Sequence, residues 1–260
     1  MSVLDSIIKG VKLDEESRRL PNTELEELIA SAPKPRSALM SLKTQELSLI
    51  AEIKRSSPSK GELSEIADPS SLARIYEESG ASVISVLTEE RRFKGSLKDF
   101  ANVRKTVELP MLRKDFMVSE YLIKESRAFG ADVILLIVAA LDDYELLDFY
   151  ELSRELGMDA LIEVHNEVEL ERALAISPKI VGVNSRNLKT LEVDTATFTR
   201  ILPLIPNNIV RVAESGISDL SDVKRARQAG ADAVLIGEAL VKSVDPAARV
   251  KEFLEGADSQ

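Results

Sequence analysis

One pattern recurs along this sequence: an amphipathic stretch, then a glycine, then a run of apolar residues. It occurs around Gly80, Gly130 and Gly230, and in a looser form around Gly157. Glycine ends helices readily because it adopts the left-handed conformation of the position that follows the last helical residue. A continuous apolar run is typical of a strand that is buried on both faces of a parallel sheet. The pattern therefore predicts a helix followed by a parallel strand, several times over.

The apolar runs number eight, at residues 48–54, 82–88, 110–115, 132–138, 159–164, 179–184, 209–213 and 233–237. Amphipathic segments such as 70–79, 142–156 and 219–228 separate them, and the spacing is close to one strand-plus-helix unit. Because eight such units close naturally, we predict an α/β fold, a (β/α)8 TIM barrel over residues 48–260. The alternative, an open doubly wound sheet, would need a phosphate-binding glycine fingerprint after the first strand, and none stands there.

Residues 1–47 precede the first predicted strand and form an N-terminal helical extension. Two helical segments, 4–19 and 22–32, lead into the linker Pro33-Lys34-Pro35. We expect this extension to plug one end of the barrel. A lid that contributes to the ligand site is the alternative.

Composition narrows the functional classes. A chain of 260 residues, 44% of them hydrophobic, can bury one large core. The absence of cysteine excludes disulfides and thiolate metal sites, and with the single His165, expected at the surface, a zinc site is disfavoured. A net charge of −10 argues against a nucleic-acid partner.

The sequence also lacks the usual signals of export and membrane insertion. It contains no apolar run of about 18 residues, and its first residues lack the basic and apolar segments of a signal peptide. We therefore expect a cytoplasmic protein without a membrane partner. We expect a monomer, with a weak homodimer as the alternative.

Two charged residues interrupt the first apolar run. Glu52 and Lys54 are two positions apart, so in a strand they project from the same face. Buried charges are costly, and such a pair is either a structural ion pair or part of a reaction site. The following loop, residues 55–61, is rich in hydroxyls and cations and suits an anion. This loop favours the second interpretation.

Polar residues end several other predicted strands: Lys114, Glu163, Asn184 and Ser215. Any one of them could be a solvated residue at the rim. In a barrel, however, the carboxyl ends of all strands meet around one axial site. Lysines and carboxylates that share a dry site change each other's proton affinity, which suits acid–base chemistry.

The last two strands suggest a phosphate site, because Gly216 and Gly237 would bring backbone N–H groups close to an anion. Simple turns are the alternative. Glu238 follows, and we expect its carboxylate to point away while its N–H faces the ligand. Apolar walls are expected from Leu87, Phe93, Phe116, Leu235, and whichever of Leu135 and Leu136 faces inward.

Together these motifs resemble the indole-3-glycerol-phosphate synthase family of tryptophan biosynthesis. The resemblance covers nearly the whole chain and rests on residues 50–59, 112–116, 161–164, 182–188 and 213–217. It implies conversion of 1-(2-carboxyphenylamino)-1-deoxyribulose 5-phosphate into indole-3-glycerol phosphate, carbon dioxide and water, without a metal or organic cofactor. The substrate carries a phosphate at one end and an aromatic carboxylate at the other, so it needs two anion sites joined by an apolar slot.

The resemblance also implies residue roles. The implied catalytic set is Glu52, Lys54, Lys114, Glu163, Asn184 and Ser215, and the implied substrate-binding set is Ser57, Phe93, Phe116, Leu135, Arg186, Gly216, Leu235, Gly237 and Glu238. Lys114 would protonate the alkoxide during ring closure, and Glu163 would act as a base or stabilise a cation. Arg186 would bind the carboxylate of the aromatic ring. Which of the two lysines serves the dehydration stays open.

Four alternatives remain at this level. A phosphoribosylanthranilate isomerase would favour a cysteine/aspartate pair, and this chain has no cysteine. A Schiff-base aldolase would form an adduct at Lys54 or Lys114 that borohydride traps. A catalytically silent phospho-ligand binder or assembly subunit would leave the strand-end acids dispensable. A reconstructed barrel, suggested by the lack of both Cys and Trp, would keep the same activity.

Overall fold

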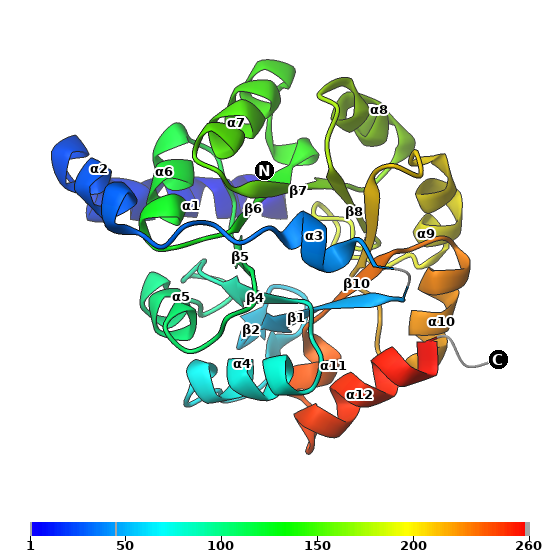
Figure 1. The fold of residues 1–260 in the computed structure, drawn as a ribbon. Coiled ribbons are helices and arrows are strands. Elements are labelled where there is room, and N and C mark those ends of the chain that lie inside the picture. The colour runs from blue at the N-terminus through cyan, green and yellow to red at the C-terminus, as the bar shows by residue number, and fades with distance from the viewer. Residues whose placement is uncertain (1, 45, 258–260) are drawn as a thin grey trace.

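Eight parallel strands close into a barrel in the order β1-β10-β9-β8-β7-β6-β5-β4 (Figure 1). The structure is a computed structural model, which describes residues 2–44 and 46–257. The predicted (β/α)8 barrel is confirmed, and each strand lies within one residue of a predicted run. The strands are β1 Ser48–Ile53, β4 Val83–Leu87, β5 Met111–Lys114, β6 Val133–Ile137, β7 Asp159–Val164, β8 Ile180–Asn184, β9 Val210–Glu214 and β10 Ala233–Ile236.

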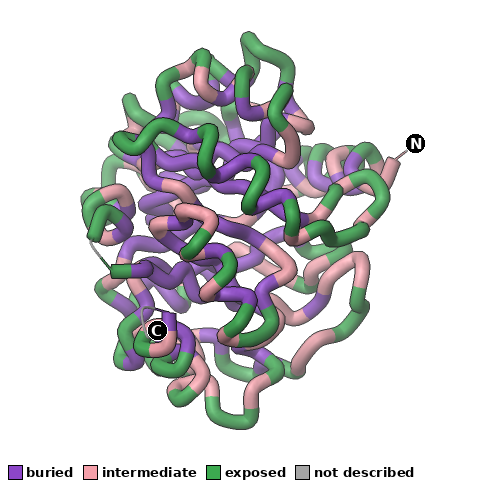
Figure 2. Tube along the Cα trace, turned by 90° about the vertical axis from the view of Figure 1, so that its right-hand side faces the viewer, coloured by how far each residue is buried: buried purple, intermediate pink, exposed green. Residues whose placement is uncertain are grey.

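Helices surround the barrel and leave its buried strands at the centre (Figure 2). The glycines of the recurring pattern have positive φ, between +77° at Gly157 and +103° at Gly80, as the helix-stop interpretation requires. The helices after the first strand are α4 Pro69–Glu78, α5 Leu97–Arg104, α6 Glu120–Ala128, α7 Asp143–Glu155, α8 Glu167–Ala175, α9 Ala196–Ile201, α10 Leu220–Gln228, α11 Glu238–Val241 and α12 Pro246–Ala257, with 3-10 turns η1 Val138–Ala140 and η2 Leu202–Leu204. None of the described helices is long and apolar enough to cross a membrane.

The N-terminal extension forms α1 Val3–Arg18, α2 Asn22–Ser31 and α3 Ala38–Leu42, and it reaches both ends of the barrel. In Figure 1, α3 lies in front of the barrel and α1 behind it. Asp159, the first residue of β7, accepts a hydrogen bond from the backbone N of Leu39 at 3.0 Å, so α3 covers the amino ends of the strands. Arg91, in the loop after β4, pairs with Asp14 at 2.7 Å, so α1 lies at the carboxyl ends. The extension therefore places α3 at the amino ends of the strands and α1 at their carboxyl ends.

A buried ion network joins this extension to the barrel. Arg113 of β5 has 0% of its surface exposed and donates to Glu125 of α6 at 2.9 Å. Glu125 also accepts two hydrogen bonds, both of 3.0 Å, from Arg18 of α1. Thr88 and Ser126 accept further hydrogen bonds from the Arg113 guanidinium. The network ties α1, α6 and β5 into one unit.

Glu125→Ala should lower the free energy of unfolding by about 3 kcal/mol, because it leaves the buried Arg113 without its main counter-ion. Chemical denaturation of the variant and the parent measures the difference. Arg18→Ala is the matched control, with a loss of about 1 kcal/mol, because Arg18 is partly exposed. Equal losses for the two variants would contradict the assignment.

Candidate active site

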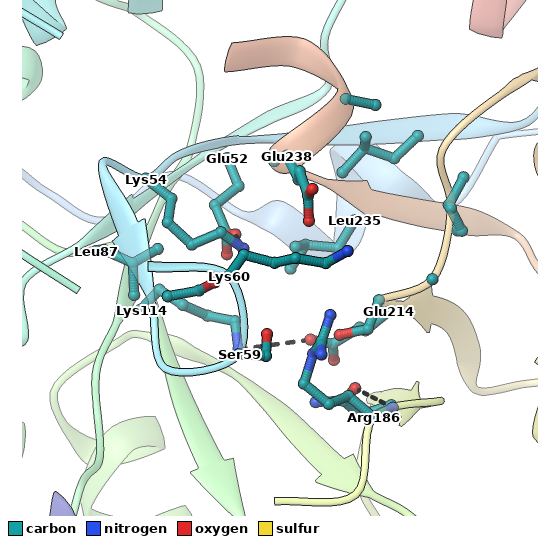
Figure 3. Close-up of a pocket in the computed structure, with 18 of the residues that line it drawn as sticks. Glu52, Lys54, Ser59, Lys60, Leu87, Lys114, Arg186, Glu214, Leu235 and Glu238 are labelled. Atoms are coloured by element: carbon teal, nitrogen blue, oxygen red, sulfur yellow. Dashed lines mark hydrogen bonds and ion pairs between the residues drawn. The ribbon is translucent and has the colours of Figure 1, made fainter. Parts of the chain in front are cut away.

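A cavity of about 820 Å³ opens at the carboxyl ends of the strands (Figure 3). Its wall contains every residue of the catalytic and substrate-binding sets that the resemblance implies: Glu52, Lys54, Ser57, Phe93, Lys114, Phe116, Leu135, Glu163, Asn184, Arg186, Ser215, Gly216, Leu235, Gly237 and Glu238. Ile7 of α1 also lines the cavity, so the extension contributes to the site. Residues from nearly the whole length of the chain thus meet in one space.

A buried charge cluster lies at the centre of the cavity. Lys114 Nζ lies 3.2 Å from Glu163 Oε2 and 3.6 Å from Glu214 Oε2. Lys54 Nζ lies 2.5 Å from Glu52 Oε1, and the side chains of all three glutamates are at most 3% exposed. The cluster therefore places two partly exposed lysines among three buried glutamates.

Glu214 is a central residue that the sequence analysis did not select. It is the last residue of β9, and the pairing Asn184↔Glu214 places it beside a residue that was selected. The signal was present, because Glu214 ends an apolar run as Glu163 does. The adjacent Ser215 and Gly216 also fit a functional turn, so the sequence alone does not single out Glu214.

Two glycines make room for the buried carboxylates. A Cβ atom on Gly182 would lie 1.9 Å from Glu214 Oε1, and one on Gly237 would lie 2.6 Å from Glu52 Oε1. Such contacts are far shorter than van der Waals distances, so neither position accepts a side chain without moving a glutamate. Gly237 therefore has a packing role in addition to the phosphate role that the sequence suggested.

The cluster separates the proton affinities of its members. Burial raises the pKa of Glu214 to about 8, and the charges of Glu163 and Glu52 add to this effect, while Lys114 only partly offsets it. Burial would raise the pKa of Glu163 too, but Lys114, His165 and Asn184 lower it well below its ordinary value. The carboxylates around Lys114 outweigh its burial and raise its pKa, so the ammonium is retained. Adjacent carboxyl groups with different proton affinities are suited to different roles in acid–base chemistry.

The turn after β9 and the hairpin after β1 border one part of the cavity. Ser215 and Gly216 have φ of +66° and +69°, so the chain turns sharply after β9. The hairpin of β2 Ser56–Ser57 and β3 Gly61–Glu62 brings Ser59 and Lys60 over the opening (Figure 3). A serine at positive φ is strained, and such strain is concentrated at functional sites.

Glu238 differs from its expected orientation. It pairs with Lys242 at 2.8 Å, and Figure 3 shows its carboxylate pointing into the cavity rather than away from it. Its backbone lies at the start of α11, which has only four residues. The pairing with Lys242 allows a carboxylate here, because the cation offsets its charge.

Another part of the cavity wall is apolar. The rings of Phe93 and Phe116 lie 6.2 Å apart, and Leu135 faces the cavity while Leu136 faces the helices. Arg186 is half-buried, and in the part of the chain that the structure describes no ion pair involves it. Its Nη1 donates only to the Leu191 carbonyl, at 3.1 Å.

The expectation that His165 is a surface residue is wrong. Its side chain is 9% exposed and lies between two carboxylates, 3.3 Å from Glu163 Oε1 and 2.8 Å from Glu169 Oε2. The residue directly follows β7, where solvent exposure is common. The ring is enclosed because α8 packs against β7 and places Glu169 over it.

Comparison with known proteins identifies relatives over almost the entire length. A family model described as indole-3-glycerol phosphate synthase matches residues 4–253. Proteins of that name from Paenarthrobacter aurescens and Micrococcus luteus are 56% and 53% identical, over 97% of this chain and 96% and 97% of theirs. A thiamine phosphate pyrophosphorylase from Pyrococcus furiosus superposes with a TM-score of 0.63 at 14% identity, covering 85% of this chain and 98% of that one. That likeness concerns the fold alone.

Gly182→Ala should reduce turnover by about a hundredfold, because the new methyl group displaces the Glu214 carboxylate from the cluster. Val183→Ala, on the same strand but facing the helices, is the matched control and should leave turnover near that of the parent. Steady-state kinetics of both variants measure the effect. Parent-like turnover in Gly182→Ala would show that the site does not depend on the position of Glu214.

Ser215→Gly should be more stable than Ser215→Ala by about 1 kcal/mol, because only glycine relieves the left-handed backbone strain. Both variants lack the hydroxyl, so the comparison isolates the backbone. Denaturant titration measures the difference in unfolding free energy. Equal stability would mean that the turn costs serine nothing.

Proposed function

We propose that the cavity of this chain, which belongs to the indole-3-glycerol phosphate synthase family, catalyses ring closure of the substrate and then dehydration of the cyclic intermediate by lysine and glutamate acid–base chemistry. The observation that carries the proposal is the position of Lys114, 3.2 Å and 3.6 Å from two buried glutamates. A protonated lysine beside carboxylates of different proton affinity supplies both an acid and a base to one substrate.

The substrate, 1-(2-carboxyphenylamino)-1-deoxyribulose 5-phosphate, matches the polarity of the cavity. Arg186, which is half-buried and forms no ion pair with another described residue, would bind the carboxylate on the ring through its planar fork. Phe93, Phe116, Leu135 and Leu235 would hold the ring. The phosphate would bind at the other end, to Lys54, Ser57, Ser215, Gly216, Gly237 and the N–H of Glu238.

Ring closure would use Lys114 as the acid. The ring carbon that bears the carboxylate attacks the ketone, and Lys114 protonates the oxygen as it becomes a hydroxyl. The C–C bond to the carboxylate then breaks, and its electron pair restores the aromatic ring as carbon dioxide leaves. Glu52 would hold Lys54 and Lys114 in place.

Dehydration would follow in the same cavity. The hydroxyl leaves as water with a proton from Lys54 or Lys114, and Glu163 takes the proton from the neighbouring carbon. Asn184 would bind a substrate hydroxyl. Two protons are donated and one is recovered, so the site takes up one proton from solvent for each carbon dioxide released.

The charge cluster also argues against a Schiff-base aldolase. A lysine must be a neutral amine to attack a carbonyl, and Lys114 is held as a cation by its carboxylate neighbours. Borohydride treatment with a phosphosugar should therefore leave Lys114 unlabelled. That the protein is a monomer and works in the cytoplasm stays a prediction of the sequence.

Lys114→Ala and Glu163→Gln should each reduce turnover by at least about a hundredfold, the usual scale for a positioned acid or base. The assay supplies the carboxyphenylamino-deoxyribulose phosphate and follows the appearance of indole fluorescence. Lys105→Ala and Glu171→Gln, at exposed positions, are the matched controls. Near-parent turnover in either cavity variant would contradict the role proposed for that residue. If the parent protein itself has no activity, the alternative of a catalytically silent ligand-binding protein would be favoured.

A further inference from the structure

His165 touches the charge cluster but lies outside the wall of the reaction cavity. Its ring is fixed from the outer side by Glu169, whose Oε2 accepts from the backbone N of His165 and lies 2.8 Å from Nδ1. Glu169 is itself held, because its Oε1 accepts a hydrogen bond from Asn166 Nδ2 at 2.8 Å. The ring therefore presents Nε2 to Glu163 Oε1 at 3.3 Å from a rigid support.

Glu163 thus has a cationic partner for each of its oxygens. Lys114 lies 3.2 Å from Oε2, and His165 lies 3.3 Å from Oε1. Burial alone would lower the pKa of His165, but the two carboxylates against its ring raise it to about 10. The imidazole is therefore an imidazolium at neutral pH.

Glu163 needs a second cationic partner, because the first, Lys114, gives up its proton in the proposed reaction. When Lys114 gives its proton to the substrate, it loses its charge, and Glu163 loses that counter-ion. A buried carboxylate without a cation becomes a strong proton acceptor, so it would compete with the substrate for the proton. The acid and the base are neighbours, and something must keep them from neutralising each other.

We propose that His165 is a positioning residue: an imidazolium, anchored by Glu169, that holds the Glu163 carboxylate in place and keeps it ionised while Lys114 donates its proton. This inference rests on the roles proposed above for Lys114 and Glu163. It assigns His165 no contact with the substrate.

Among the described residues, the charged groups paired with the His165 ring are two glutamates, and they favour its protonated form. Glu163 faces it from β7 and Glu169 from α8. His165 lines a second, separate cavity of about 350 Å³. Lys189, Glu192, Asp194 and Arg200 line the same cavity. Arg200 pairs with Glu167 at 2.8 Å and with Asp194 at 3.7 Å. Among the described residues, no hydrogen bond or ion pair joins these four groups to His165.

The test is the pH dependence of kcat/KM in His165→Asn. Without the imidazolium, the midpoint of the acidic limb should rise by at least about one pH unit, and turnover on that limb should fall about tenfold. KM should stay within about twofold, because His165 lies outside the reaction cavity. Arg200→Gln, which removes one positive charge from the same region without touching Glu163, should keep the parent profile.

Two further variants separate a positioning role from a merely structural one. Glu169→Gln should shift the acidic limb in the same direction by a smaller amount, and it serves alone if His165→Asn does not fold. In a Glu163→Gln background, His165→Asn should have no additional effect on turnover, because it acts through Glu163. A parent-like pH profile in the folded variants, or an additional loss in that background, would overturn the proposal. Parent-like turnover of Glu163→Gln itself would instead overturn the proposed function.

Discussion

The site depends on the ion pairs that Lys114 makes with Glu163 and Glu214 inside the barrel. Placing charges away from water is costly unless they are paired at short distance, so each member needs the others. The barrel supplies this proximity through strand register. The pairings Ile137↔Glu163 and Asn184↔Glu214 set the level of each carboxylate, and a slip of one residue would turn them toward the helices.

Two neighbouring residues on β5 have different surroundings: one belongs to the buried ion network and the other lines the cavity. Arg113 and Lys114 alternate in direction, so the arginine is buried under α6 while the lysine enters the cavity. Arg113 is held by Glu125, and Glu125 is held by Arg18 of the N-terminal helix. The inner face of β5 thus carries the Lys114 ammonium into the cavity. Its outer face is linked through Glu125 to α1, the helix that borders the cavity.

The charge cluster also explains where glycine is required. Gly182 and Gly237 stand where a Cβ atom would displace a glutamate, and neither has positive φ. By contrast, Gly80 and Gly130 end helices and need positive φ for that purpose. Sequence patterns identify the second kind readily, because the glycine precedes an apolar run. The need for glycine at positions 182 and 237 arises from a glutamate side chain on the neighbouring strand, so only the tertiary structure reveals it.

The sequence by itself determined the barrel and the members of the site that end its strands. Apolar runs spaced one unit apart permit few other closed arrangements, and the carboxyl ends of parallel strands must meet, so Glu52, Lys114 and Glu163 could be expected together. Only the tertiary structure decided the surroundings of His165 and Glu214, which no local sequence pattern specifies. His165 is enclosed because α8 brings Glu169 over its ring, and Glu214 belongs to the cluster because its register aims it at Lys114. Burial and charge are properties of what surrounds a residue, and those surroundings come from distant parts of the chain.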